Sequence, residues 1–188
     1  MTVRGWSVEL VKCGAVPPVV IRELRRDLAL CLAHPVWISD QSIGIDVAFS
    51  PERQQYAADV LLRGLLDPVP HEGLRRIGIV SEDLFLSVFT HVFGNAQFNG
   101  QVAVASTYRL TPSYSDQPPD PQCLRLRLLK EVMHELGHTL GLVHCKVPWC
   151  VMSPSLDPDH VDLKDPAFCA ICADRIDVPQ DRIFSFLK

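Results

Sequence analysis

Residues 122–142 constrain the fold more than any other stretch of this sequence. Their apolar side chains recur at spacings of three and four, without a proline, so they predict a long helix with a buried face. His134 and His138 lie four residues apart in this stretch. Side chains at that spacing project from the same side of a helix, one turn apart, so the two imidazoles can share one metal ion.

Three further residues extend this pattern. Glu135 lies beside the histidines, where its carboxylate can reach a metal-bound water without binding the metal itself. Gly141 can adopt a left-handed conformation that ends the helix, so His144 can return as a third ligand. Three imidazoles leave one zinc position open, which is typical of a catalytic zinc. The complete pattern resembles the metzincin signature, whereas the two helix histidines alone would also fit solvated side chains.

Met152 follows His144 by eight residues, in a region without helical periodicity. The metzincin signature includes a methionine turn beneath the metal. We therefore interpret Met152 as a hydrophobic floor under the three histidines that contributes no ligand atom. The alternative is a methionine that fills an irregular gap in the core.

Cysteines are concentrated near the end of the chain. Two pairs lie in one short stretch: Cys145, Cys150, Cys169 and Cys172. Two thiol pairs predict a closed tetrahedral zinc site with a structural role, and two disulfide bonds are the alternative. Residues 143–174 contain few large apolar side chains, so a metal would replace the missing core. Because His144 precedes Cys145, this site would also hold His144 in place.

The rest of the sequence predicts an α+β fold with a mixed sheet. We expect one domain, residues 1–188, with an N-terminal lobe of residues 1–142 that includes the active-site helix and a small irregular C-terminal lobe of residues 143–188. An exposed loop is expected at 112–121 and a short helix at 181–187. Further strands are expected at 6–11, 43–49, 74–80, 89–93 and 100–105, and further helices at 18–33 and 51–65.

Composition excludes several classes of partner. The formal net charge is -4 and 21% of residues are charged, which gives no basic footprint for nucleic acid or anionic lipid. No apolar run reaches the length of a membrane span. Residues 1–18 lack the apolar core of a secretory signal, so we expect a cytoplasmic protein, with a monomer as the default.

The long C-terminal motif resembles the archaemetzincins. It continues from His144-Cys145 through Cys150-Val151-Met152, and the likeness extends with less specificity over residues 50–175. Its later positions are Ser155, Asp162, Lys164, Phe168, Cys169 and Cys172. The resemblance implies a two-lobed zincin peptidase with one catalytic and one structural zinc. It also implies that residues 100–106 form the upper rim of the cleft and pair with an extended substrate, although an ordinary buried strand fits them equally.

The functional hypothesis is a zinc-dependent peptidase acting on peptides or proteins. Glu135 would take a proton from a zinc-bound water and return it to the leaving amine. The alternatives are a zinc-stabilised peptide- or protein-binding module with little or latent activity, and a hydrolase of other amides or esters. We favour a solvated helix charge for Glu131 over support of a ligand. The remaining histidines and cysteines carry no metal role: His34, His71, His91, His160, Cys13, Cys31 and Cys123.

Overall fold

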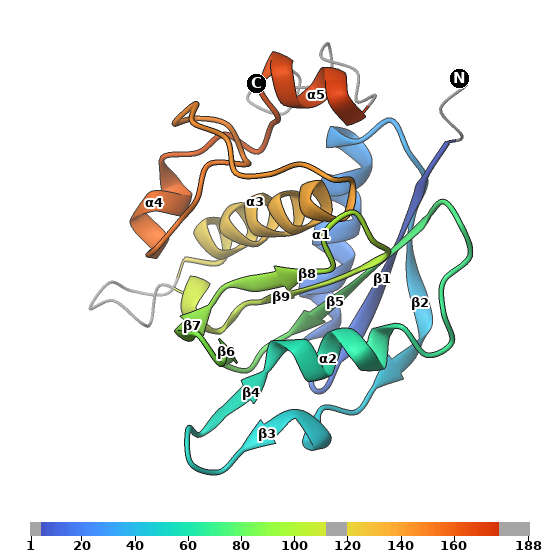
Figure 1. Cartoon of the computed structure of the whole chain (residues 1–188), viewed down its shortest axis with the longest axis vertical. Coiled ribbons are helices and arrows are strands. Elements are labelled where there is room, and N and C mark those ends of the chain that lie inside the picture. The colour runs from blue at the N-terminus through green and yellow to red at the C-terminus, as the bar shows by residue number, and fades with distance from the viewer. Residues whose placement is uncertain (1–4, 112–119, 177–188) are drawn as a thin grey trace.

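A five-stranded sheet forms the centre of the computed structural model, which describes residues 5–111 and 120–176 (Figure 1). Four of its strands are parallel, and the fifth, β8, runs antiparallel to its neighbour β9. The strand order is β2 (Val36–Ile43), β1 (Ser7–Cys13), β5 (Leu74–Val80), β9 (Val102–Ser106) and β8 (Gly94–Ala96).

Helices cover both faces of this sheet, which explains why β9 is apolar from Val102 to Ala105. In β9, Val102 and Val104 pack into one core cluster, whereas Ala103 and Ala105 pack into the other. A strand buried on both faces reads as a continuous apolar run rather than an alternating one. The helix on the valine side is α2 (Ala58–Leu65), and those on the alanine side are α1 (Pro18–Cys31) and α3 (Pro121–Thr139).

Helix α3 starts and ends close to the predicted limits of 122 and 142. The side chain of Asp120 accepts a hydrogen bond of 2.9 Å from the backbone N–H of Gln122, and Pro121 occupies the first turn, where its missing N–H is not needed. Almost every residue from 127 to 139 is buried. The helix is therefore enclosed between the sheet and the C-terminal segment rather than half exposed.

The region around residue 50 differs from the prediction. Instead of a strand at 43–49 and a helix from 51, the chain forms β2 earlier, a short 3-10 helix η1 (Asp46–Ala48) and a turn, and α2 begins only at Ala58. Pairing between strands distant in sequence overrides the local helical pattern here. Four short strands form a second sheet in the order β3 (Phe49–Ser50), β4 (Gln55–Ala57), β6 (Leu84–Leu86) and β7 (Phe89–Val92).

Of the two interpretations of residues 100–106, the cleft rim is wrong and the ordinary buried strand is confirmed. Strand β9 lies between β5 and β8 and is buried, so its two edges are already paired. The edge strand is β8, whose three residues include a glycine and gave no recognisable strand pattern. Strand order depends on tertiary pairing, which periodicity does not encode.

The C-terminal segment packs on α3 and shares its core. Cys150, Val151, Met152 and Phe168 belong to the same buried cluster as α1 and α3. The segment carries α4 (Pro158–Asp162) and α5 (Ala170–Ile176), and η2 (Tyr108–Leu110) precedes the undescribed part of the predicted 112–121 loop. The helix predicted at 181–187 and the division into lobes at 142 stay predictions, since the former lies outside the described residues.

Candidate metal centres

The end of α3 brings three histidines together. The N–H of Leu142 donates to the carbonyl of Gly137 at 2.9 Å, and the N–H of Gly141 donates to the carbonyl of His138 at 3.0 Å. These two bonds form a Schellman cap, which requires a left-handed residue, and Gly141 has φ +87°. The chain reverses at this cap. As a result, one ring nitrogen each of His134, His138 and His144 lies within 4.8 Å of the others.

Hydrogen bonds orient two of these rings. Nδ1 of His134 lies 2.8 Å from the carbonyl oxygen of Val151, and Nδ1 of His138 lies 2.8 Å from that of Leu142. A carbonyl only accepts, so each Nδ1 carries the proton and each Nε2 presents a lone pair. The two Nε2 atoms are 3.1 Å apart. Zn–N bonds of about 2.0–2.1 Å in a tetrahedron place nitrogens roughly 3.3 Å apart, so the donor set fits zinc.

Electrostatics favour the ligand form of the histidines. Burial lowers the pKa of His134 well below its usual value, and burial also lowers the pKa of His138 and of His144. Neutral imidazole is the form that binds a metal. Burial likewise raises the pKa of Glu135 well above its usual value, with a further contribution from the charge of Glu131. A cation held by the histidines would lower the pKa of Glu135.

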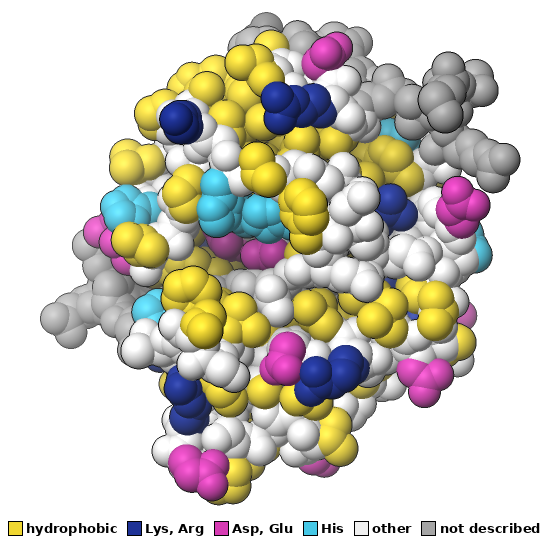
Figure 2. All heavy atoms as spheres, in the orientation of Figure 1, with side chains coloured by type: hydrophobic (Ala, Val, Ile, Leu, Met, Phe, Trp, Pro, Cys, Tyr) yellow, Lys and Arg dark blue, Asp and Glu magenta, His cyan; other side chains and the backbone are white. Residues whose placement is uncertain are grey.

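These residues line a cleft of about 520 Å³ between α3 and the edge strand β8. Figure 2 shows a hollow with acidic side chains beneath a row of histidines, bordered by hydrophobic side chains. Helix and strand approach closely here. A Cβ atom added at Gly94 would lie 2.7 Å from Cγ of Glu135 and 2.7 Å from the carbonyl oxygen of Val104. The missing side chain of Gly94 therefore leaves the space that the Glu135 carboxylate occupies.

Met152 packs directly against the back of α3. A Cβ atom at Gly137 would lie 2.3 Å from Sδ of Met152, and the Met152 side chain is fully buried. The backbone carbonyl of Met152 accepts a 2.9 Å hydrogen bond from the N–H of Cys145. One short segment thus supports the histidine helix on one side and the first cysteine on the other.

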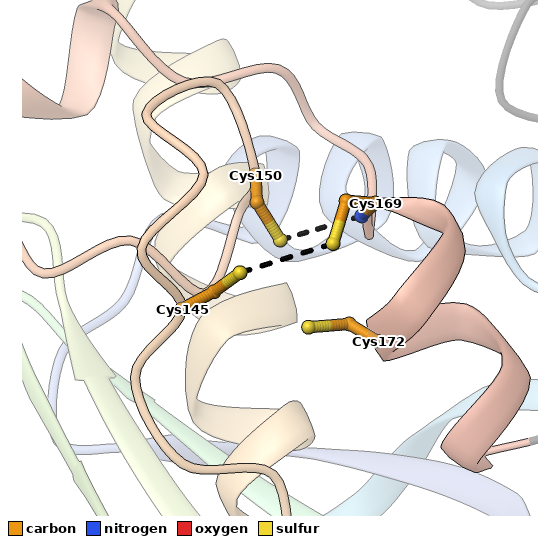
Figure 3. Close-up of side chains that lie close together, drawn as sticks. All are labelled: Cys145, Cys150, Cys169 and Cys172. Atoms are coloured by element: carbon orange, nitrogen blue, oxygen red, sulfur yellow. Dashed lines mark hydrogen bonds between the residues drawn. The ribbon is translucent and has the colours of Figure 1, made fainter.

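Four cysteine side chains converge at a second point (Figure 3). Cys145 and Cys150 come from the loop after α3, Cys169 immediately precedes α5, and Cys172 lies on its first turn. Their sulfur atoms all lie within 4.8 Å of one another, and those of Cys145 and Cys169 are 3.8 Å apart. Zn–S bonds of about 2.3 Å in a tetrahedron give a sulfur separation of roughly 3.8 Å. The cluster therefore has the size of a four-thiolate zinc site.

The expectation that Glu131 is a solvated charge is wrong. Its side chain is 4% exposed and forms a 3.1 Å ion pair with Lys164, whose side chain is 2% exposed. Nζ of Lys164 also donates to the carbonyl oxygen of Ser153 at 3.2 Å. The pair joins α3 to the segment that follows Met152. Helical spacing places Glu131 on the metal face of α3, but the partner lies 33 residues away and no local pattern predicts it.

The cysteines and histidines that were given no metal role lie in different surroundings. Cys13 and Cys31 are buried and Cys123 is partly buried. Within the described residues, the histidines outside the motif join neither metal-ligand group. His34 stacks on Trp6 with ring centroids 3.7 Å apart, whereas His91 lines the cleft, a position that the sequence did not reveal.

The open three-histidine group, the acidic residue beside it and the cleft define a zinc metallopeptidase. A family model for peptidase family M54 matches residues 46–178. The archaemetzincin of Haloquadratum walsbyi is 37% identical over 169 residues, which cover 88% of this chain and 96% of that protein. The chain belongs to peptidase family M54.

Solved structures agree with this assignment. The crystal structure of archaemetzincin from Methanopyrus kandleri matches with a TM-score of 0.76 and 32% identity, over 94% of this chain and 97% of that one. A zinc-dependent peptidase from Methanocorpusculum labreanum matches with a TM-score of 0.80 and 27% identity, over 90% of this chain and 100% of that one. The zincin-like α+β fold is thus confirmed. No helix in the described ranges is long and apolar enough to cross a membrane.

Proposed function

We propose that this chain cleaves peptide bonds with Glu135 as the general base, beside a zinc ion held by His134, His138 and His144. The observation that carries the proposal is the orientation of two imidazoles by backbone carbonyls, which leaves their Nε2 lone pairs 3.1 Å apart in the cleft that Glu135 also lines. Lone pairs at this separation repel unless a cation lies between them.

The residues of the chain have separate tasks in this mechanism. Zinc bound by the histidines supplies a Lewis acid that polarises a carbonyl and lowers the pKa of water. Glu135 accepts the proton of the attacking water and delivers it to the leaving amine. Gly141 turns the chain so that His144 joins the other ligands, and Met152 supports α3 from behind. The buried surroundings of Glu135 strengthen its interactions with charges that develop during the reaction.

Strand β8 is the proposed substrate-binding edge. It lines the cleft with all three of its residues, and only its β9 side is paired within the sheet. An extended peptide can add to such an edge through backbone hydrogen bonds. The peptide would then lie between β8 and α3, with one of its carbonyl groups beside the three histidines.

A second zinc ion is assigned to the four cysteines, giving two per chain. Its four thiolates would fill the tetrahedron, so this ion would have a structural role. Residues 144–152 couple the histidine site to the cysteine site. A backbone hydrogen bond joins Cys145 to Met152, and His144 directly precedes Cys145. Loss of the cysteine-bound metal would therefore release His144 as well.

The test is peptide cleavage by zinc-loaded protein, analysed by mass spectrometry on a diverse peptide mixture. The wild-type chain is compared with Glu135→Ala, which removes the proposed base, and with Glu52→Gln, which removes an exposed carboxylate elsewhere. We expect cleavage by the wild-type chain and by Glu52→Gln but not by Glu135→Ala, with equal zinc content in all three.

Two results would contradict the proposal. Equal cleavage by the Glu135→Ala protein would show that Glu135 is not the base. Absence of cleavage by every protein, together with peptide binding, would favour the alternative of a zinc-stabilised binding module with latent activity.

A further inference from the structure

The cleft contains a second buried carboxylate with unused hydrogen-bonding capacity. Glu131 lies one helical turn before Glu135, is 3% exposed and lines the cleft. Its one hydrogen bond within the described residues joins Oε1 to Lys164. Oε2 has no hydrogen-bond partner within the described residues, so it can accept a bond from a group that enters the cleft.

A second polar group that lines the cleft has no hydrogen-bond partner within the described residues. It is the buried hydroxyl oxygen of Ser155. Around these two groups the wall is apolar. It is formed by Leu86, Phe89, Val92, Phe93, Pro154 and Leu156.

Beyond its histidines, the described part of the cleft offers acidic but no basic side chains to an occupant. Among the described residues that line it, two are carboxylates and none is lysine or arginine. Lys164 does not line the cleft, because its ammonium group is 2% exposed and is used by Glu131 and by the carbonyl of Ser153. Figure 2 likewise shows acidic but no basic side chains inside the hollow.

Distances along α3 place this pocket relative to the scissile bond. Four residues of helix separate Glu131 from Glu135, a rise of about 6 Å. An extended peptide advances roughly 3.3 Å per residue, so about 6 Å corresponds to two residues at most. A substrate side chain within two residues of the cleaved bond would reach Glu131.

We propose that Glu131 and Ser155 form the floor of a specificity pocket that selects a lysine or arginine side chain within two residues of the cleaved bond. The inference rests on the proposed peptidase function. The apolar wall contacts the methylene stem of the side chain, and Oε2 of Glu131 accepts from its cationic head. Such a charge-assisted bond is stronger than a neutral one.

The experiment uses zinc-loaded protein and matched peptides that carry lysine, arginine, norleucine, glutamine or glutamate at each position within two residues of the cleaved bond. At one position we expect kcat/KM to be about tenfold higher for lysine or arginine than for norleucine, as for one additional hydrogen bond to a charge. Glu131→Gln should reduce this ratio to about one, whereas the Glu52→Gln control should retain it.

A double variant separates the loss of the Glu131 carboxylate from the effect of an unpaired Lys164. Because Glu131→Gln leaves the Lys164 ammonium without its counter-ion, the double variant Glu131→Gln/Lys164→Met is measured in parallel. Equal kcat/KM for lysine and norleucine peptides in the wild-type chain, or a lysine preference that persists in both Glu131 variants, would overturn the proposal. A preference for glutamate would overturn it too.

A binding measurement separates this pocket from the peptidase function. Peptide affinities are measured by calorimetry with zinc-loaded Glu135→Gln. If the wild-type chain cleaves no peptide but this variant binds lysine peptides about tenfold more tightly than norleucine peptides, the pocket stands and the hydrolytic proposal fails. Equal affinities would overturn the pocket independently of any cleavage.

Discussion

At the scale of single residues, two glycines shape the active site. Gly141 supplies the left-handed cap that returns His144 to the other histidines, and Gly94 leaves room for Glu135. The first requirement is visible in the motif, because a glycine after a helix suggests such a cap. The second is invisible in the sequence, since the strand that contains Gly94 approaches α3 only in the folded chain.

A methyl group at Gly94 should disturb the active site. In Gly94→Ala the new Cβ meets both Glu135 and the carbonyl of Val104 at 2.7 Å, so strand or carboxylate must shift. We expect the free energy of unfolding to fall by about 1–3 kcal/mol, as for overpacked sites, and peptide turnover to fall with it. Urea denaturation and steady-state kinetics measure the two effects. Gly44→Ala is the matched control, because nothing lies within 4 Å of its new Cβ, and an equal loss in that variant would refute the steric explanation.

The isolated thiols should be unreactive in the folded chain. Burial raises the pKa of Cys13 from 9.0 to about 12, so at pH 8.5 the folded protein contains almost no Cys13 thiolate. Iodoacetamide should label Cys13 rapidly in urea but not in buffer, as peptide mapping would reveal. Because the folded chain holds the Cys13 proton more tightly than the unfolded chain, the stability that this proton contributes is fully present below pH 9. It is lost as the pH rises from 9 to 12. Comparable labelling in buffer and urea would contradict this assignment.

At the scale of elements, α3 is held to the C-terminal segment by buried charges. The Glu131–Lys164 ion pair has both side chains less than 5% exposed. Removing one partner leaves the other charged and buried, which is costly, whereas removing both is much less so.

Substitutions of Glu131 and Lys164 should be strongly non-additive. Lys164→Met should lower the free energy of unfolding by about 3–5 kcal/mol, and Glu131→Gln/Lys164→Met should recover most of that loss. Denaturant titration of the wild-type chain, Glu131→Gln, Lys164→Met and the double variant gives the coupling energy. Additive effects would indicate that the two charges are independently solvated.

The elements predicted from sequence and those missed differ in what stabilises them. Helices α1 and α3 and strands β1, β5, β7 and β9 fall near the expected ranges, because their periodicity and caps are local. Strands β4, β6 and β8 have three residues each, too short for a periodic pattern, and β4 and β6 pair with each other across 28 residues of sequence. The three histidines and four cysteines were predictable because fixed ligand spacing, like helical periodicity, is a local pattern.

At the scale of the whole molecule, the C-terminal segment should depend on its metal. Cys172→Ser should lower the zinc content from two ions per chain to one or fewer, because His144 is released as well. It should also accelerate amide hydrogen exchange in residues 143–176 by about tenfold or more, while β1, β5 and β9 remain protected. Hydrogen-exchange mass spectrometry and metal analysis test this. Unchanged exchange in that segment would mean that core packing around Phe168 suffices without metal.

The long-range contacts also explain which partners of the site escaped prediction. Lys164 contacts Glu131, and the edge strand lines the cleft, only through tertiary packing. Glu131 was therefore taken for a solvated charge, and the sequence could not decide whether residues 100–106 form the rim or an ordinary buried strand. The monomeric state stays a prediction, to be measured by light scattering.

The most direct measurement is anomalous diffraction at the zinc edge from crystals of the zinc-loaded chain. We predict two peaks. One lies about 2.0–2.1 Å from one ring nitrogen each of His134, His138 and His144, with its fourth position free of protein ligands, and the other lies about 2.3 Å from four cysteine sulfurs. Absence of the peak at the histidines, or a protein side chain in its fourth position, would contradict a catalytic zinc beside Glu135.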